Sequence, residues 1–140
     1  MQPLSGLFVL DFTTLLPGPL ATLMLAEAGA EVMKIEQPGG ENARRFPPMI
    51  DGESAAFLML NRGKKSITLD LKNKMDRAAL APLITRADIL VEQFRPGVMA
   101  RLGLAYDDLC KVNPRIIYCS ISGYGQSGPR VHEAGHDLNY

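Results

Sequence analysis

The two histidines of this 140-residue chain stand four positions apart, in the run HEAGH. His132, Glu133 and His136 match the H-E-x-x-H pattern, in which two histidines on one helix face bind zinc and the glutamate acts as a general base. The preceding run GQSGPR favours a loop, and Gly135 lowers the helix propensity inside the motif. A chance match in a loop is therefore preferred to zinc hydrolysis, and no metal site is expected.

A glycine-rich run, GYGQSG, lies just before this motif. Its Gly123, Gly125 and Gly128 have the G-x-G-x-x-G spacing of a dinucleotide-binding turn and follow an expected strand. Pro129 comes immediately afterwards, and the motif normally occupies the first strand–helix turn of its unit. We therefore prefer a tight glycine-rich loop to a nicotinamide site.

Composition limits the possible function classes. Hydrophobic residues make up 46% of the chain and charged residues 21%, which suffices for one domain with a core. Fifteen basic residues balance fifteen acidic ones, so no global attraction to nucleic acid or to an anionic membrane is expected. The longest apolar stretch, residues 20–26, is far shorter than the roughly 20 residues that span a bilayer.

Cysteine usage and the first residues bear on the compartment. Cys110 and Cys119 are the only two cysteines, and they form neither a disulfide framework nor a CxxC pair. The opening run MQPLSGLFVLDF lacks the basic start of a secretory signal. We therefore expect a reducing, cytoplasmic compartment.

The hydrophobic pattern alternates between strands and helices. Strands are expected over residues 7–12, 31–36, 66–71, 89–93 and 116–122. Helices are expected over residues 20–28, 75–85, 98–102 and 107–112. The first is apolar almost all round and stops at Gly29, which indicates a buried helix with a glycine cap, while Asn73 can cap the second. Residues 37–53, rich in proline and glycine, are expected to form a loop.

This alternation predicts an α/β fold, a mostly parallel sheet with helices on both faces. Ligands of such sheets bind beyond the carboxyl ends of the strands. The loops after Phe12, Glu36, Gln93 and Ser122 are therefore the expected site.

Five collinear blocks carry a resemblance to a known family. They are PGPLATLMLAEAGAEVMKIE, NRGKKSITLDLK, EQFRPGVMARLGL, NPRIIYCSISGYGQSGP and AGHDLNY, and together they resemble the family III CoA-transferases, most of all their alpha-methylacyl-CoA racemase branch. The resemblance implies a Rossmann-like large domain, a smaller second domain and an interlocked homodimer. Residues 1–140 then correspond to the N-terminal part of the CoA-binding large domain, without its remainder or the small domain.

The racemase branch implies a particular chemistry. Removal of the weakly acidic α-proton of a thioester needs a base at the carbon and stabilisation of the enolate oxygen. By resemblance His136 is one acid/base, and a downstream aspartate serves the opposite face. The expected function is therefore racemisation of 2-methylacyl-CoA, with these residues inactive alone.

Two alternatives stay open beside racemisation. One is a CoA-transferase that moves CoA between carboxylic acids through an aspartyl acyl intermediate, and the other is a non-catalytic CoA-binding fragment. Transferases of the family usually lack the histidine, so His136 favours the racemase. Asp137 is expected to cap a helix start, or to offer its backbone N–H to the thioester oxygen.

The resemblance also implies which residues bind CoA. Those at the adenine end and phosphates are Leu69, Asp70, Leu71, Lys72, Gln93, Phe94, Arg95 and Arg101. Those at the thioester end are Gly135, His136, Asp137, Leu138, Asn139 and Tyr140. CoA belongs to the substrate, so no separate cofactor is expected, and the expected partners are an acyl-CoA thioester and a second copy of the chain, not nucleic acid or a membrane.

One position departs from the racemase pattern. Gln37 stands where racemases often have an arginine that helps to bind the coenzyme. Arg44 or Arg45 could replace it, and the basic cluster of Arg62, Lys64 and Lys65 is a further phosphate candidate.

Overall fold

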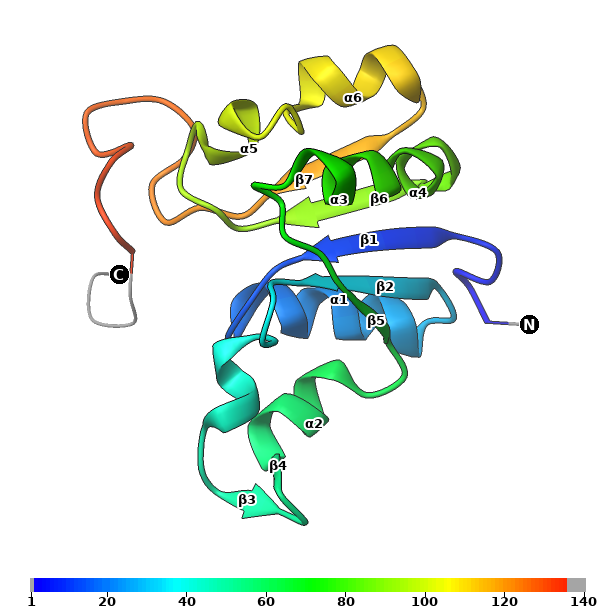
Figure 1. The fold of residues 1–140 in the computed structure, drawn as a ribbon, viewed down its shortest axis with the longest axis vertical. Coiled ribbons are helices and arrows are strands. Elements are labelled where there is room, and N and C mark those ends of the chain that lie inside the picture. The colour runs from blue at the N-terminus through cyan, green and yellow to red at the C-terminus, as the bar shows by residue number, and fades with distance from the viewer. Residues whose placement is uncertain (1, 136–140) are drawn as a thin grey trace.

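A five-stranded parallel sheet forms the centre of the computed structural model, which describes residues 2–135 (Figure 1). Its strands are β1 (Phe8–Phe12), β2 (Glu31–Glu36), β5 (Lys65–Thr68), β6 (Ile89–Glu92) and β7 (Ile117–Ser120). Their order is β5-β2-β1-β6-β7, and every neighbouring pair is parallel. The predicted α/β sheet is thereby confirmed.

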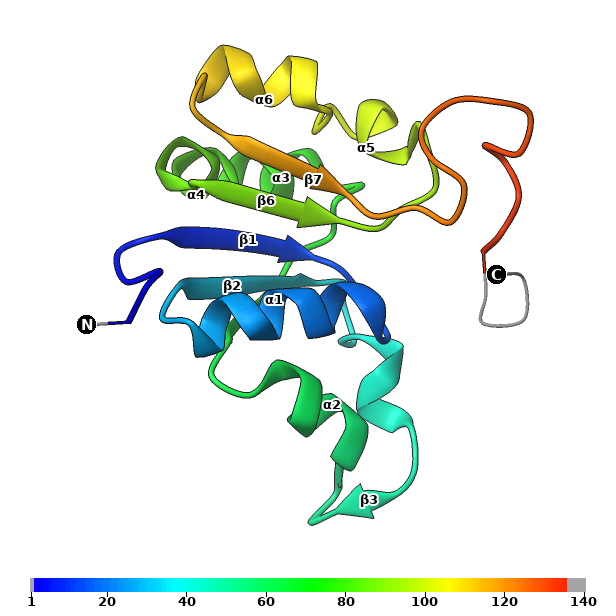
Figure 2. The same cartoon turned by 180° about the vertical axis from the view of Figure 1, so that it is seen from behind.

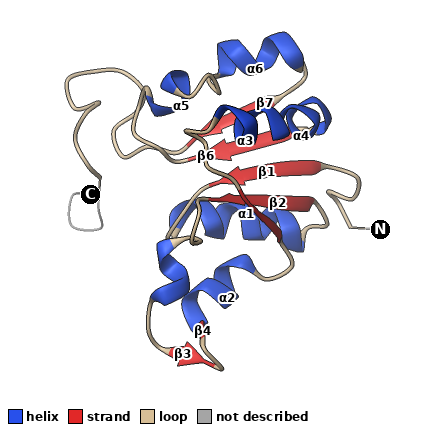
Figure 3. Ribbon diagram, in the orientation of Figure 1, coloured by secondary structure: helices blue, strands red, loops and turns tan. Residues whose placement is uncertain are grey.

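Helices cover both faces of this sheet, as expected (Figures 1 and 2). The helices are α1 (Pro17–Glu27), α2 (Ala55–Asn61), α3 (Lys74–Ala79), α4 (Ala81–Arg86), α5 (Val98–Arg101) and α6 (Tyr106–Val112), with a 3₁₀ turn η1 (Asn42–Arg45). Helix α1 lies on one face, and α3 to α6 lie on the other, as the colouring by element type in Figure 3 makes plain.

Successive side chains of β1 point to opposite faces of the sheet, so its odd- and even-numbered residues pack against different helices. Phe8, Leu10 and Phe12 pack into the core beneath α4, α5 and α6. Val9 faces the α1 side with Val32 and Val91. Asp11 has the same parity as Val9, so it too lies on the α1 side, and it is fully buried there.

Helix α1 begins earlier and is less buried than expected. Pro17 occupies its first turn, where a missing N–H costs no hydrogen bond. The chain leaves the helix through Gly29 at φ +105°, a conformation that glycine adopts without strain. The prediction of a buried helix is wrong for one side of α1, because Leu20 and Met24 are exposed.

The helix expected over residues 75–85 is two helices instead. The break falls between Ala79 and Ala81. Pro82 is the cause, since proline has no N–H for the helical ladder and its ring clashes with the preceding turn. Asn73 caps α3 as predicted, accepting a hydrogen bond from the Met75 N–H.

The segment 37–53 is more ordered than a loop. It contains η1 and a short hairpin of β3 (Met49–Ile50) and β4 (Glu53–Ser54). Asp51 and Gly52 turn the hairpin at φ 51° and 84°, the conformation that Asp-Gly favours between strands. Helix α2 was not predicted, although Ser54 caps it by accepting from the Phe57 N–H.

None of the helices formed by residues 2–135 is both long and apolar enough to cross a bilayer.

Candidate functional site

The loops that follow β1 and β6 begin side by side, at the carboxyl ends of two neighbouring strands. From there the chain runs to opposite sides of the sheet. Strands β1 and β6 are neighbours, yet β2 follows β1 on one side and β7 follows β6 on the other. A crevice for ligands forms at such a point. Gln93 joins its two loops, because its Nε2 donates to the Thr14 carbonyl at 2.6 Å and its Oε1 accepts from the Gly18 N–H at 3.1 Å.

Gly18 is the residue that lets these loops approach. A Cβ at this position would lie 2.3 Å from both Gln93 Oε1 and Thr13 Cβ. A side chain here would therefore displace Gln93 or the β1–α1 loop. The predicted binding residue Gln93 thus has a structural role, since its amide joins the β1–α1 loop to the end of β6.

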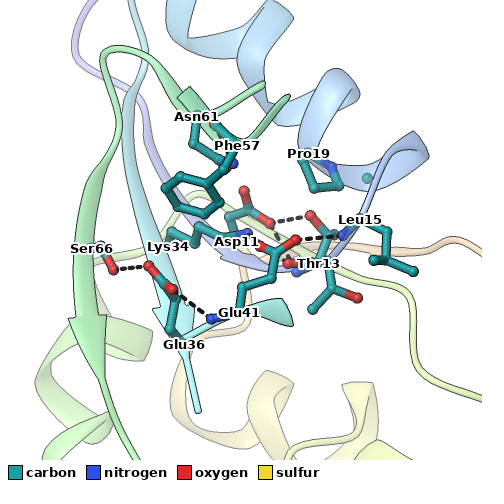
Figure 4. Close-up of polar contacts among 12 residues, drawn as sticks. Asp11, Thr13, Leu15, Pro19, Lys34, Glu36, Glu41, Phe57, Asn61 and Ser66 are labelled. Atoms are coloured by element: carbon teal, nitrogen blue, oxygen red, sulfur yellow. Dashed lines mark hydrogen bonds and ion pairs between the residues drawn. The ribbon is translucent and has the colours of Figure 1, made fainter. Parts of the chain in front are cut away.

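A buried charge network lies behind this crevice, between the sheet and helices α1 and α2 (Figure 4). Asp11 Oδ1 accepts from the N–H and hydroxyl of Thr13, at 2.9 and 2.5 Å. Asp11 Oδ2 accepts from Thr22 Oγ1 at 2.6 Å and from Lys64 Nζ at 3.1 Å. Burial lowers the pKa of Lys64, and the Asp11 carboxylate opposes that change.

A second pair holds the loop that follows β1. Lys34 Nζ lies 2.6 Å from Glu41 Oε2, with both side chains at most 2% exposed. Lys34 also donates to the Thr13 carbonyl at 2.8 Å. Glu41 Oε1 accepts from the Leu15 N–H at 2.6 Å. Two successive parts of the loop are therefore bound to one buried ion pair.

Glu36, at the end of β2, is the centre of a third group. Arg44 donates to both of its oxygens, at 2.7 and 2.6 Å, and Ser66 and the Glu41 N–H donate as well. Burial alone would raise the pKa of Glu36, but these hydrogen bonds lower it to about 2.

Neither arginine proposed to replace the arginine missing at Gln37 is fully free. Arg44 is held by Glu36 and lies 3.8 Å over the Phe57 ring. Arg45 is exposed and donates to the Gly39 carbonyl at 2.9 Å. Arg44 therefore has a structural role in the fold, and its suggested contact with the coenzyme stays a prediction.

The basic cluster of Arg62, Lys64 and Lys65 is not a free phosphate site either. Lys64 is buried against Asp11. Arg62 pairs with Glu27, and Lys65 pairs with Glu31. All three cations are neutralised by carboxylates, because the folded chain brings distant acidic residues to each of them.

The structure unites much of the predicted CoA set on the other face of the sheet. Leu69, Leu71 and Phe94 pack against the same core cluster. Asp70 turns the chain after β5, since its carboxylate accepts from the Lys72 N–H at 2.9 Å and its own N–H donates to Asp76.

Arg101 lines a groove of about 640 Å³ between α3–α4 and α5–α6. Lys74 and Arg77 line the same groove, and Arg77 donates to the Leu71 carbonyl at 2.6 Å. Within residues 2–135, the side chains of Lys72, Lys74 and Arg101 have no ion-pair partner. This groove therefore has unpaired cations beside the predicted adenine-end segment, although Asp108 lines it too. Lys74 and Arg77 were not among the residues predicted from the sequence.

Arg95 lines a separate hollow of about 270 Å³ near the ends of β6 and β7, together with Tyr106, Tyr118 and Gln126. Tyr106 and Tyr118 meet edge to face, with centroids 6.2 Å apart. Burial, with a smaller contribution from the Glu92 charge, raises the pKa of Tyr118, so its hydroxyl stays protonated and donates to the Leu104 carbonyl.

The two motifs near the C-terminus lie in loops and turns as far as the structure describes them. Gly125 and Gly128 have φ of 85° and 101°, and no helix follows them up to residue 135. Glu133 pairs with Arg130 rather than facing a metal. Among residues 2–135 no group of three acidic, histidine or cysteine side chains could hold a metal ion.

The residues predicted at the thioester end fall at the limit of the described part of the chain. Gly135 is half-buried. The predicted residues His136, Asp137, Leu138, Asn139 and Tyr140 lie outside the described residues.

A parallel sheet with this strand order, covered by helices on both faces and with a switch point between β1 and β6, places the chain in the class of doubly wound α/β domains. The model of CoA-transferase family III matches residues 4–140, and the chain belongs to this family.

Curated relatives and a solved structure agree with this assignment. The chain is 48% identical to an acetyl-CoA:oxalate CoA-transferase of Acetobacter aceti, covering 96% of this chain and 35% of the relative. It is 46% identical to a succinyl-CoA:glutarate CoA-transferase of Mus musculus, covering 98% and 32%. The crystal structure of Rv3272 from Mycobacterium tuberculosis superposes with a TM-score of 0.92 at 45% identity, covering 99% of this chain and 39% of that one. The chain thus spans about a third of the length of the curated relatives it matches.

These relatives overturn the expected racemase. Four relatives that match 95–98% of this chain at 44–48% identity are named as CoA-transferases for oxalate, glutarate or mesaconate. The interpretation of His136 as a marker of racemisation was therefore wrong, because it gave one residue more weight than similarity along the whole segment.

Proposed function

We propose that the protein containing these residues is a CoA-transferase, which moves CoA from an acyl-CoA thioester to a carboxylic acid. The main observation behind this proposal is the groove lined by Lys74, Arg77 and Arg101, because it can bind a phosphate-bearing coenzyme. Coenzyme A brings a 3′-phosphate and a diphosphate, and charge-assisted hydrogen bonds from lysine and arginine are the strongest contacts available to them.

The described residues supply the binding part of this chemistry. Lys72 and the three groove cations would hold the phosphates. Leu69, Leu71 and Phe94, which are partly buried against the core, would contact the adenine. The pantetheine arm would then lead to the crevice between the β1 and β6 loops. The aspartate that accepts the acyl group in family transferases lies, by resemblance, beyond these residues.

The names of the relatives suggest which acids to test. Several transfer CoA to or from short dicarboxylic acids, including oxalate and glutarate. We propose carboxylic acids of this kind as acceptors, and acetyl-CoA or succinyl-CoA as donors. By family resemblance, we also propose that the complete protein is a homodimer.

Product analysis tests the proposal. The full-length protein is incubated with acetyl-CoA or succinyl-CoA and each candidate acid, and the acyl-CoA products are separated by chromatography. Formation of the acceptor's CoA thioester, with release of the donor acid in equal amount, is the expected result. Binding of CoA without any transfer, or uptake of solvent deuterium at the α-carbon as the only reaction, would overturn it.

A further inference from the structure

Leu15 has an unusual backbone conformation in the loop that reaches the crevice. Its φ is 62°, a left-handed value that residues with side chains adopt only when their surroundings hold them there. Leu15 and Leu16 are 44% and 54% exposed. Side-chain packing therefore contributes little to holding this turn.

Polar contacts from beneath the loop hold it instead (Figure 4). The Leu15 N–H donates to Glu41 Oε1 at 2.6 Å, and Lys34 Nζ holds the preceding Thr13 carbonyl at 2.8 Å. Lys34 and Glu41 are themselves paired at 2.6 Å and almost fully buried. From the other side of the crevice, Gln93 holds the Thr14 carbonyl.

We propose that Glu41, supported by Lys34, is a positioning residue that sets the conformation of residues 13–16 for CoA transfer. This inference rests on the proposed function, since it assumes that the reacting thioester enters the crevice. The Glu41 side chain is only 2% exposed beneath the loop, so the proposed role acts through the loop and not through contact with substrate. Its loss should reduce kcat more than it changes the KM for the CoA donor, whose nucleotide is held at the separate groove of Arg101.

Two substitutions separate the reach of Glu41 from its charge. Glu41→Asp keeps the negative charge opposite Lys34 but is one methylene too short to reach the Leu15 N–H. Glu41→Gln keeps an oxygen at the right distance and removes the charge. We expect Glu41→Asp to lower kcat at least tenfold and Glu41→Gln to retain more of it, while Glu53→Asp, a control at an exposed glutamate, leaves kcat unchanged.

A rescue experiment tests the role of backbone strain. Glycine adopts φ 62° freely, whereas alanine does not. Leu15→Gly combined with Glu41→Asp should therefore recover part of the lost kcat, and Leu15→Ala combined with Glu41→Asp should not. Because both double variants lack the leucine side chain, the difference between them reports the backbone alone.

The outcomes distinguish this inference from the proposed function. If the wild-type protein transfers no CoA, the proposed function has failed. If transfer occurs and Arg101→Ala raises the KM for the donor, but Glu41→Asp keeps kcat within twofold, the positioning role is wrong. Loss of kcat in Glu41→Gln with retention in Glu41→Asp would also overturn it, since charge balance for Lys34 would then be the only role. Equal rescue by glycine and alanine would do the same.

Discussion

Lys64 Nζ lies 3.1 Å from Asp11 Oδ2, and the two side chains are 1% and 0% exposed. The ammonium also donates to Thr22 Oγ1, Asn61 Oδ1 and the Pro19 carbonyl, at 2.8 to 3.0 Å. One cation thereby joins β1, α1 and the end of α2. Its partner is 53 positions away in the chain, so the pair exists only in the folded protein.

Breaking this pair should be costly. Asp11→Leu leaves the Lys64 charge buried without a partner, and we expect a loss of about 3–5 kcal/mol in the free energy of unfolding. Asp11→Leu combined with Lys64→Met removes both charges and should cost less than the single change. Denaturant unfolding followed by circular dichroism measures both, with Glu27→Gln in the exposed Arg62 pair as a control expected to stay within about 1 kcal/mol. A double variant less stable than the single one would contradict this prediction.

Glu36 should make stability depend on acid pH. Its pKa is about 2 in the folded protein and near 4.5 when unperturbed. A depressed carboxyl pKa stabilises the fold fully above pH 4.5, and this contribution is lost as the pH falls toward 2. At pH 7, Glu36→Gln should cost about 3 kcal/mol, and the difference from wild type should shrink on acidification. Unfolding midpoints between pH 7 and 3 test this, and a constant difference across that range would count against it.

Gly18→Ala should disturb the crevice. The new methyl group would lie 2.3 Å from Gln93 Oε1 and Thr13 Cβ, so the loop or the Gln93 side chain must move. We expect both a lower melting temperature and a loss of CoA transfer. Gly52→Ala is the control, because a Cβ at Gly52 would meet no other atom. Its only cost is the strain of alanine at a φ of 84°, about 1 kcal/mol in the free energy of unfolding. Equal effects of the two changes would show that the close approach at Gly18 is unimportant.

Arg101→Ala should weaken binding of the coenzyme. Removing one charge-assisted hydrogen bond costs about 1.5–3 kcal/mol, so the Kd for CoA should rise roughly tenfold to a hundredfold. Arg115→Ala is the matched control, since Arg115 is exposed just before β7 and does not line the groove. Calorimetric titration with CoA measures the change, and a short thioester without the nucleotide should be much less affected. Equal losses for CoA and the short thioester would refute the assignment.

The sequence by itself determined the local elements and the fold class. Alternating hydrophobic runs specified all five strands of the parallel sheet, because strand period and burial are local properties of a pattern. Other elements differed from the prediction. The expected helix over residues 75–85 is divided at Pro82, and helix α2 and the β3–β4 hairpin were missed, although the Asp51-Gly52 turn and Ser54 mark them in the sequence. The quoted blocks also identified the family correctly, but the choice of racemase within it was wrong.

Only the tertiary structure decided which charges are free. In the sequence, Arg44, Lys64 and Lys65 look as available for phosphate as Lys74 and Arg101. In the fold, Glu36, Asp11 and Glu31 neutralise the first three, while Lys74 and Arg101 line an open groove. The physical reason is that an ion pair depends on the distance between two side chains, and parallel strands bring together residues far apart in the chain.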